Sequence, residues 1–340
     1  MKVTLKDIAE RVNVSVSTVS RVLNNTPTSI DEETRNEIFS ISRELGYKKH
    51  MKPTEKIRNI SEVQIGLLLN NSKNKYKDPY FSEIIYGIEQ ELMDQGLNIQ
   101  FTIDEQELQE GMLPTKFTGD NTAIIVVGPL ENSYLQTIKQ QVSIIISVGG
   151  NPSLPIDYVT LDFKKSAFNA VSHLLNLGHR DIAFIGANAL SESVITEEAR
   201  YQGYEQALNN ANIPIKKEWI KNGSFTVNGG YRAMKEILSL DHLPTALFIA
   251  SDRMSYGAYR AIQEKGLTIP NDISIISFDD LEMSPYINPP LTTVRVHKEE
   301  LGRIAVKLLS ERVKGEITLP LTTYLPTELI VRKSCGNNNK

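Results

Sequence analysis

The chain has 340 residues, which is too long for one compact core and suits two or three domains. Hydrophobic residues make up 40% of it and charged residues 23%, which is ordinary for a globular protein. The net charge of −4 by itself argues against a nucleic-acid-binding protein, but residues 1–58 hold 11 Lys and Arg against 8 Asp and Glu, and the remainder holds 26 against 33. A basic N-terminal region on an acidic body suits DNA contact through one end only.

Two short helices joined by a tight turn are predicted within residues 3–24, VTLKDIAERVNVSVSTVSRVLN. Apolar residues at helical spacing give the first helix one buried face, formed by Leu5, Ile8, Ala9 and Val12. Asn13 follows where the turn needs a residue that tolerates a positive φ. Ser15 is a suitable N-cap for the second helix, residues 16–23.

The second helix is predicted to bury three apolar residues, Val19, Val22 and Leu23. It leaves four residues available to face outward, Val16, Ser17, Ser20 and Arg21. A short helix with small polar groups and one arginine near its start suits contact with base edges in the major groove of DNA. The alternative is an ordinary helical hairpin with no role in DNA binding.

This string resembles the DNA-binding headpiece of the lactose/galactose repressor (LacI/GalR) family, whose pattern is roughly T-L-x-D-[IV]-A-x-x-A-G-V-S-x-x-T-V-S-R-V-[LV]-N. The matching residues are Thr4, Leu5, Asp7, Ile8, Ala9, Val14, Ser15, Thr18, Val19, Ser20, Arg21, Val22, Leu23 and Asn24. Val12 and Asn13 stand where the family usually has Ala and Gly, and both keep the chemistry of the position. The resemblance implies DNA contacts from Thr4, Ser15, Val16, Ser17, Thr18, Ser20, Arg21 and Asn24.

A third helix is predicted from Asp31 to Gly46, with an apolar stripe formed by Ile38, Ile41 and Leu45. The polar and basic segment after it is interpreted as a linker. In the family this linker holds a hinge helix that orders on the operator and inserts a leucine into the minor groove, but the usual A-R-x-L signature is absent here. Pro53 could begin a short helix over residues 54–59, in which Ile57 is the candidate wedge between base steps. A flexible tether is the alternative.

From Gln64 the pattern changes to strands that alternate with helices. Apolar runs predict strands at residues 64–69, 98–103, 122–128, 143–149, 158–162, 181–186, 246–251 and 272–280. Amphipathic patterns predict helices at residues 80–96, 163–179, 197–212, 228–240 and 253–266. Repeated βα units predict an α/β body of two doubly wound parallel sheets, with ligands bound in a cleft at the carboxyl ends of the strands.

Four segments are predicted along the chain. Residues 1–47 form a helix-turn-helix headpiece and residues 48–62 a hinge. Residues 63–334 form a ligand-binding and dimerisation core of two subdomains with crossovers, and residues 335–340 a polar tail.

The body also resembles the family, whose core is similar to a periplasmic sugar-binding protein. The resemblance is carried by LGHRDIAFIG, ARYQGYEQAL, ALFIASDRMSYGAYRAIQEKGLTIPNDISIISFDD and NPPLTTVRVHKEELG, and with the headpiece it covers nearly the whole chain. Between Ile103 and Thr122 the chain is short where most members carry a full helix. This shortening, with DPYFSEIIYGIE, looks most like the branch that holds the evolved β-galactosidase repressor and related galactose-operon regulators.

Two charged residues are the main candidates for ligand binding. Arg200 matches an arginine with which family members grip ligand hydroxyls or a carboxylate, and its planar fork suits vicinal sugar hydroxyls. Asp279 and Asp280 end a predicted strand at the edge where ligands bind. Neighbours on a strand point to opposite faces, so they cannot flank one bond as the paired carboxylates of a glycosidase do. Asp279 is interpreted as an acceptor for hydroxyls and Asp280 as structural; a surface arginine and a structural aspartate pair are the alternatives.

Five further residues complete the predicted ligand site, Tyr80, Phe81, Phe225, Ser251 and Asp252. The family has a ligand-contacting polar side chain at the Ser251 position, although capping of the next helix would also explain Ser251 and Asp252. Phe225 matches an aromatic residue that stacks on the sugar in sugar-binding members, and the first strand–helix loop holds the other two aromatic residues; core packing is the alternative for all three. Val148 lies where some lactose-responsive members have an aspartate, which leaves the identity of the sugar open.

The sequence contains no nucleophile–base pair, phosphate-binding glycine loop or metal motif, and no cofactor is expected. Four histidines, His173, His179, His242 and His297, are interpreted as ordinary helix-end or surface residues. Cys335 is the only cysteine, which excludes an intramolecular disulfide, and it is interpreted as an incidental surface thiol. No apolar run approaches ~18 residues and no signal peptide is recognised, so a cytoplasmic protein is expected.

These features predict a transcriptional repressor, not an enzyme, that binds a near-palindromic operator as a homodimer. A small ligand, a galactose-type sugar or a galactoside, is expected to control it. Three alternatives stay open: a regulator that needs a purine or phosphoprotein corepressor, a cytoplasmic sugar-binding protein with a vestigial head, and a glycosidase. Tetramers are not expected, because a C-terminal leucine heptad is missing from the sequence.

Overall fold

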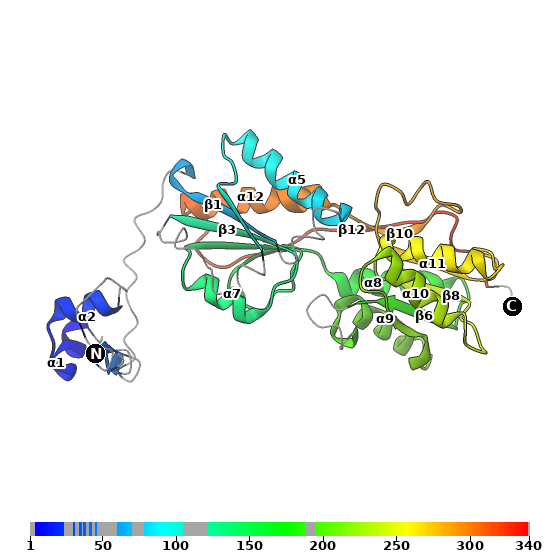
Figure 1. Cartoon of the computed structure of the whole chain (residues 1–340), viewed down its shortest axis with the longest axis horizontal. Coiled ribbons are helices and arrows are strands. Elements are labelled where there is room, and N and C mark those ends of the chain that lie inside the picture. The colour runs from blue at the N-terminus through cyan, green and yellow to red at the C-terminus, as the bar shows by residue number, and fades with distance from the viewer. Residues whose placement is uncertain are drawn as a thin grey trace. The chain divides into compact units, whose positions relative to one another are not determined.

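The chain divides into two compact units, Met1–Lys56 and Ile57–Lys340, each with its own hydrophobic core (Figure 1). The computed structural model describes residues 4–23, 60–69, 78–104, 121–187 and 195–338, together with residues 30, 34, 35, 37, 38, 41, 42 and 45. Among these described residues, no helix combines the length and the apolar character that crossing a membrane requires.

The first unit begins with the two predicted helices, α1 (Leu5–Val12) and α2 (Val16–Leu23). Thr4 caps α1 reciprocally with Asp7: the Thr4 amide lies 2.6 Å from the Asp7 carboxylate, and the Thr4 hydroxyl accepts from the Asp7 amide. Asn13 ends α1 in the left-handed conformation, with φ 56°, so the predicted turn is confirmed.

The apolar faces of these helices meet in one small core, whose buried residues are Ile8, Ala9, Val12, Val19, Val22 and Ile38. Leu23 was predicted to be buried but is only partly so, because it is the last residue of α2 and fewer neighbours cover it. Ile41 and Leu45 also pack against this core, as expected of a third helix. Residues 34, 35, 37, 38, 41 and 42 are helical.

The body contains two sheets, and the first has six parallel strands in the order β11-β5-β4-β3-β1-β2. Its strands are β1 (Gln64–Leu69), β2 (Phe101–Asp104), β3 (Thr122–Val127), β4 (Ile144–Val148), β5 (Asp157–Thr160) and β11 (Thr322–Tyr324). Helices α5 (Pro79–Asp94) and α12 (Lys298–Lys314) lie together on one side of it, and α7 (Asn132–Lys139) lies on the other (Figure 1).

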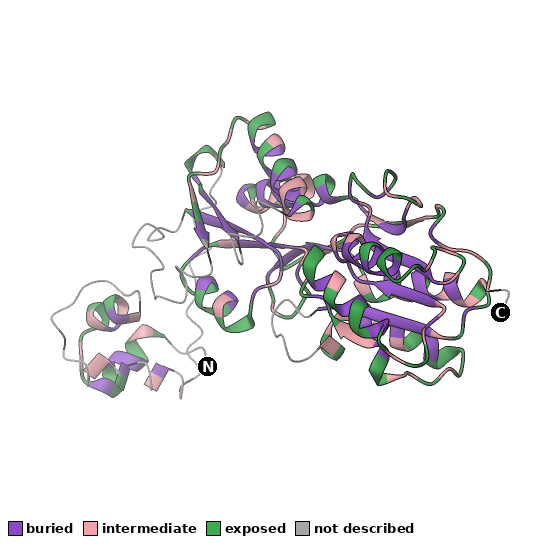
Figure 2. Ribbon diagram, turned by 45° about the vertical axis from the view of Figure 1, so that its right-hand side comes forward, coloured by how far each residue is buried: buried purple, intermediate pink, exposed green. Residues whose placement is uncertain are grey.

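The second sheet has the order β12-β10-β9-β8-β6-β7. Its strands are β6 (Ile182–Gly186), β7 (Ile220–Asn222), β8 (Ala246–Ile249), β9 (Ser274–Asp279), β10 (Thr292–Val296) and β12 (Thr327–Ile330). Helices α8 (Phe163–Asn176) and α9 (Ala199–Asn210) pack together, as do α10 (Val227–Ile237) and α11 (Asp252–Glu264). Buried residues follow the strands of both sheets (Figure 2), as in sheets that helices cover on both faces.

The edge strand β12 runs antiparallel to β10, so the prediction of purely parallel sheets is wrong there. The direction follows from the path of the chain. Strand β10 ends where the chain leaves the second sheet toward α12. Strand β12 follows β11 of the first sheet without a connecting helix, which a parallel neighbour of β10 would need, so it enters the second sheet in the opposite direction to β10.

The chain passes between the two subdomains three times, after β5, after β10 and after β11. Each passage leaves from the carboxyl end of a strand. The carboxyl ends of the parallel strands in both sheets therefore face the junction between the subdomains, where ligands bind in folds of this kind. These crossovers agree with the predicted two-subdomain body, although α7, β7, β10, α12, β11 and β12 themselves were not predicted from the sequence.

Helices α5 and α12 cross at two glycines. A Cβ atom on Gly87 would lie 2.0 Å from the carbonyl oxygen of Glu299, and one on Gly302 would lie 2.2 Å from that of Ile84. No side chain fits at such distances, so the two helix backbones touch. The contact holds the beginning of α12 beside the first turns of α5.

Residues 334–336, near the C-terminus, are packed against the second sheet. The Ser334 hydroxyl donates to the Ile275 carbonyl at 2.6 Å and accepts from the Thr292 amide at 2.7 Å. Cys335 is half-buried, its Sγ lies 3.0 Å from the same Ile275 carbonyl, and burial raises the pKa of its thiol to about 12. The interpretation of Cys335 as a surface thiol is therefore wrong, and a thiol with so high a pKa is a poor nucleophile.

His179 lies at the C-terminal end of α8, where its amide donates to the Leu174 carbonyl at 3.1 Å, so it is a helix-end histidine as predicted, but its side chain is buried rather than at the surface. Its Nε2 lies 3.1 Å from the Gly336 carbonyl oxygen and its Nδ1 lies 2.9 Å from the Thr245 hydroxyl. A carbonyl only accepts, so Nε2 carries the proton and Nδ1 accepts from Thr245. Burial lowers the pKa of His179 and favours this neutral form.

Candidate functional site

Several side chains of helix α2 lie outside the hydrophobic core of the first unit and are exposed. Val16 is 44% exposed although it is apolar, and Ser17 and Arg21 are also exposed. Ser20 is partly buried. An exposed valine beside an exposed serine and arginine forms a surface that can contact methyl groups and hydrogen-bonding atoms of base edges.

The remaining predicted DNA contacts have local roles or lie beyond the described residues. Ser15 caps α2, since its Oγ accepts from the Thr18 amide at 3.0 Å and lies 2.7 Å from the Thr18 hydroxyl. Thr4 caps α1 in the same way. Capping orders the backbone that carries the exposed residues. Asn24 and Ile57, with the hinge around Ile57, lie outside the described residues.

In the body, Arg200 lies in the first turn of α9, next to the junction. Its Nε donates to the Glu198 carboxylate at 2.8 Å and its Nη1 to the Ala250 carbonyl at 3.0 Å. Three aromatic rings surround the guanidinium, with centroids 5.0 to 5.4 Å from its Cζ: Phe163, Phe225 and Phe278. Among the described residues none accepts from Nη2, so this group is left to bond a ligand.

The loop before α10 holds Phe225 against Arg200 in an unusual backbone conformation. Ser224 and Phe225 both have φ 50°, which bulky residues rarely adopt. The Asn222 side chain accepts from the Ser224 amide at 2.8 Å and supports this turn. Backbone strain of this kind persists where the surrounding structure enforces it, and it often marks a binding site.

Asp279 ends β9 and is only 4% exposed. No described residue donates a hydrogen bond to its carboxylate, although a buried charge normally has such partners. Burial raises the pKa of Asp279 well above its ordinary value, the nearby Asp252 raises it further, and the positive charge of Arg200 opposes the shift. A buried carboxylate that no described residue bonds has unused capacity to accept hydrogen bonds.

The carboxylate of the neighbouring Asp280, unlike that of Asp279, is paired with cationic side chains. Its carboxylate lies 2.8 Å from Arg295 Nε and 2.8 Å from Arg332 Nη2. Both aspartates have positive φ, 112° for Asp279 and 49° for Asp280, so the strand turns sharply between them. This geometry supports a structural role for Asp280 and leaves Asp279 available to a ligand.

Ser251 and Asp252, like Asp279 and Asp280, differ in whether the described residues bond their side chains. Ser251 precedes α11, but its hydroxyl does not cap the helix, and among the described residues none bonds it. Asp252 is fully buried and accepts from the Leu281 amide and from the hydroxyls of Ser284 and Thr293, at 2.6 to 2.8 Å. Ser251 therefore stays a candidate for ligand contact, whereas Asp252 holds the loop that follows Asp279.

The first subdomain contributes Tyr80 and Phe81 from the first turn of α5, with their rings 5.1 Å apart in an edge-to-face arrangement. Burial raises the pKa of Tyr80, and the next cause is the negative charge of Asp279 across the junction. An ion pair also joins the subdomains here, because Arg253 Nη1 lies 2.6 Å from the carboxylate of Asp78. Asp279 of the second subdomain is thus near enough to Tyr80 of the first for its charge to raise the pKa of the tyrosine.

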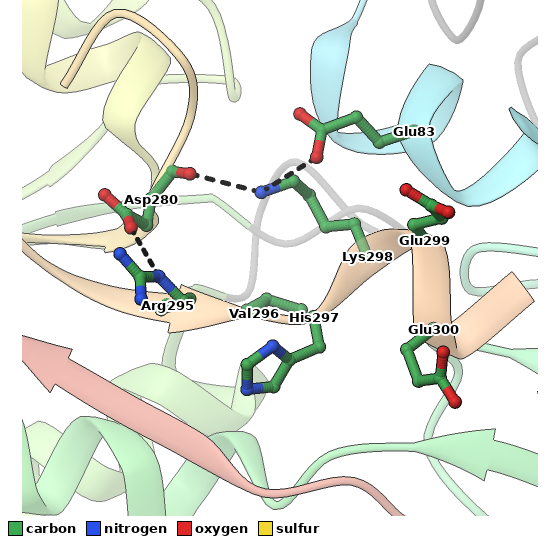
Figure 3. A pocket seen from close by; sticks show the side chains of 8 residues that line it. All are labelled: Glu83, Asp280, Arg295, Val296, His297, Lys298, Glu299 and Glu300. Atoms are coloured by element: carbon green, nitrogen blue, oxygen red, sulfur yellow. Dashed lines mark hydrogen bonds and ion pairs between the residues drawn. The ribbon is translucent and has the colours of Figure 1, made fainter. Parts of the chain in front are cut away.

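The sequence analysis missed several residues that shape this site. Glu198 orients Arg200, Phe163 stacks 6.0 Å from Phe278, and Arg253 ties the subdomains together. An acidic residue two positions before a candidate arginine was a usable signal for Glu198. A pocket of about 440 Å³ at the same junction is lined by Glu83, Asp280, Arg295, Val296, His297, Lys298, Glu299 and Glu300 (Figure 3).

Each of the two compact units of the chain is similar to a known protein family. Residues 4–50 match the model of the bacterial regulatory proteins of the lacI family, and residues 171–335 match a periplasmic binding protein-like domain. The chain is 35% identical to the transcriptional repressor MelR of Bacillus subtilis (strain 168), over 98% of each chain. It is 32% identical to the repressor PurR of Actinobacillus pleuropneumoniae serotype 3 (strain JL03), over 99% of each.

A solved structure, the complex of the transcriptional regulator CelR with cellobiose, covers 98% of this chain and 99% of its own, with 26% identity and a TM-score of 0.73. The similar proteins are repressors or regulators of transcription rather than enzymes. Their names do not point to one effector.

Proposed function

The chain belongs to the LacI family of bacterial regulatory proteins, and from this premise we propose that an uncharged sugar, of the galactose or galactoside type, controls its binding to an operator. The chain is a DNA-binding transcriptional repressor with a ligand-binding body. Repressors of this family bind operators and small effectors and act as dimers. The observation that carries the proposal is the buried Asp279 carboxylate, which has no hydrogen-bond donor from the described residues and whose pKa the positive charge of Arg200 lowers.

Vicinal hydroxyls fit this pair because each hydroxyl both donates and accepts. The Asp279 carboxylate can only accept and the free Nη2 of Arg200 can only donate, so one sugar edge satisfies both. The ring of Phe225 offers an apolar face to the apolar face of a pyranose. Ser251 supplies a further hydroxyl.

Charge favours a neutral ligand over a phosphorylated one. Glu198 lies 2.8 Å from Arg200 and neutralises it, while Asp279 remains without a hydrogen-bonded cation. A phosphate would bring further negative charge into a buried site where the raised pKa of Asp279 already reflects a cost for negative charge. Charge thus distinguishes a free sugar from its phosphate; the galactose type itself rests on the sequence resemblance to the galactose-operon branch.

Arg21→Ala should weaken specific operator binding by roughly 1–3 kcal/mol, because Arg21 is the exposed arginine of α2 and is placed to bond a base edge. Fluorescence anisotropy with operator and with random DNA measures the specific and the non-specific affinity separately. Lys6→Ala is the control, since Lys6 is an exposed cation on α1. It should lower both affinities equally and slightly. An equal effect of Arg21→Ala on both DNAs contradicts a base contact.

In a thermal-shift panel, D-galactose or methyl β-D-galactoside should raise the melting temperature, whereas galactose 6-phosphate should not. A ligand at a hundred times its Kd stabilises the native state by about 2.7 kcal/mol. Arg200→Ala should reduce sugar affinity by roughly ten- to a hundredfold, since a hydrogen bond to a charged group is lost. Operator binding without sugar should persist in this variant.

Arg260→Ala is the matched control in that panel, because Arg260 is exposed on α11 and forms an ion pair with Glu264 four residues later. It should leave the sugar response unchanged. A shift with hypoxanthine or guanine in place of the sugars would support a purine corepressor, the second candidate suggested by the similarity to PurR. A shift with cellobiose alone would keep a sugar effector but contradict the galactose type.

A further inference from the structure

We propose that Lys298 is a positioning residue that holds the Asp279–Asp280 turn in its ligand-binding conformation and ties this turn to helix α5 of the other subdomain. This inference rests on the proposed function, because it takes Asp279 as the acceptor for the ligand. Lys298 itself is not placed in contact with the ligand.

Lys298 is the first residue of α12 and is only 4% exposed. A buried ammonium group is very unfavourable unless its three N–H groups find acceptors. Its Nζ lies 2.9 Å from the carbonyl oxygen of Asp279 and 3.3 Å from that of Asp280. The third neighbour is the Glu83 carboxylate, at 3.3 Å. The side chain therefore reaches the turn and α5 together (Figure 3).

The turn needs such support because two consecutive non-glycine residues have positive φ. Each of these conformations is disfavoured by sterics and persists only where other contacts enforce it. Two carbonyl oxygens that converge on one buried cation provide that enforcement. Other groups also hold the loop, since Asp252 accepts from the Leu281 amide and Asp280 pairs with Arg295. Among the described residues, Lys298 alone bonds the backbone carbonyls of both aspartates.

The contact between Lys298 and the Asp279–Asp280 turn joins the two subdomains. Strand β9 belongs to the second sheet, whereas α12 and α5 lie on the first and touch at Gly87 and Gly302. The first turn of α5 carries Tyr80, whose pKa the charge of Asp279 raises, and Glu83 follows three residues later. A shift of the Asp279 turn when ligand binds would thus move Lys298 or break its bonds, and α5 would respond through Glu83.

The ligand-free protein gives the first test, by hydrogen exchange followed by mass spectrometry. Lys298→Met keeps an unbranched apolar side chain but removes the ammonium group. We expect the amides of residues 279–284 to exchange about tenfold faster or more, because the turn opens more often without its support. Lys314→Met is the matched control, since Lys314 ends the same helix, is half exposed and forms an ion pair with Glu311. It should leave this segment unchanged.

A double-mutant cycle with methyl β-D-galactoside gives the second test. Lys298→Met should weaken binding about tenfold in the otherwise unchanged protein but cause no further loss in Asp279→Asn, because a positioning residue acts through the group it positions. Lys298→Arg should recover part of the affinity. Glu83→Gln should keep the sugar affinity within about twofold while the sugar releases the operator less effectively, since only the tie to α5 is weakened.

The two tests separate the inference from the function on which it rests. Unchanged exchange of residues 279–284 in Lys298→Met, or affinity losses that simply add in the cycle, overturn the positioning role. Full sugar affinity in Asp279→Asn overturns the proposed ligand contact, while the exchange measurement still decides whether Lys298 holds the turn. A Glu83→Gln protein that responds to sugar like the unchanged chain overturns the tie to α5.

Discussion

Asp279→Asn should lower sugar affinity by about ten- to a hundredfold while making the ligand-free body more stable at neutral pH. The affinity falls because a charged acceptor is replaced by a neutral amide, and a hydrogen bond to a charged group is worth more than one to a neutral group. The stability rises because the native Asp279 carboxylate is buried without a donor from the described residues. An amide needs no such desolvation of charge.

The pH dependence of this gain has a definite sign. Burial raises the pKa of Asp279 in the folded protein, so the folded state binds its proton more readily than the unfolded state. The native protein therefore loses stability as the pH rises through the raised pKa, and regains it as the pH falls toward the ordinary value of 3.8. Asp279→Asn lacks this loss, so its advantage should be largest at high pH and should shrink on acidification.

Urea unfolding at several pH values between 5 and 8 measures the advantage, and calorimetry with methyl β-D-galactoside measures the affinity. The neighbouring variant Asp280→Asn is the contrast, because it breaks pairs with Arg295 and Arg332 and should destabilise the body. A less stable Asp279→Asn protein at pH 8 would show that a partner outside the described residues satisfies this carboxylate.

Arg312→Met should destabilise the first subdomain by roughly 3–5 kcal/mol, the usual effect of removing one member of a buried ion pair. Arg312 is 12% exposed and Asp157 6%, and the two form paired hydrogen bonds of 2.6 Å. The guanidinium also donates to the carbonyls of Ile317 and Leu319, which hold the loop before β11. Methionine fills a similar volume but leaves the Asp157 carboxylate buried without its cation.

Circular dichroism in urea measures this loss. The double variant Asp157→Asn with Arg312→Met should recover part of it, because no isolated buried charge remains. Lys314→Met, two positions along the same helix, should change stability little, since its ion pair is exposed. A loss below about 1 kcal/mol for Arg312→Met would mean that water reaches Asp157 and replaces the arginine.

Sequence patterns predicted the structural features that depend on interactions between residues close together in the chain. The Asn13 turn depends only on neighbouring residues, so it was recognisable without a structure. Buried runs such as residues 64–69 predicted strands because both faces of a helix-covered sheet must be apolar. Arg200 was found by resemblance and Asp279 by its place at the end of a predicted strand, and the structure brings them to the same junction from two distant parts of the chain.

Long-range packing decided the rest. The direction of β12 and the burial of Cys335 and His179 depend on strands and loops far away in sequence, which no local period encodes. Lys298 is one lysine among many in the sequence, and it becomes special only because the Gly87–Gly302 crossing brings α12 to the Asp279 turn. The sequence by itself thus determined the family of the chain and the residue types at its site. Tertiary structure alone decided which charges are buried, which are paired and which are left for a ligand, because burial and pairing depend on contacts that form only when the whole chain has folded.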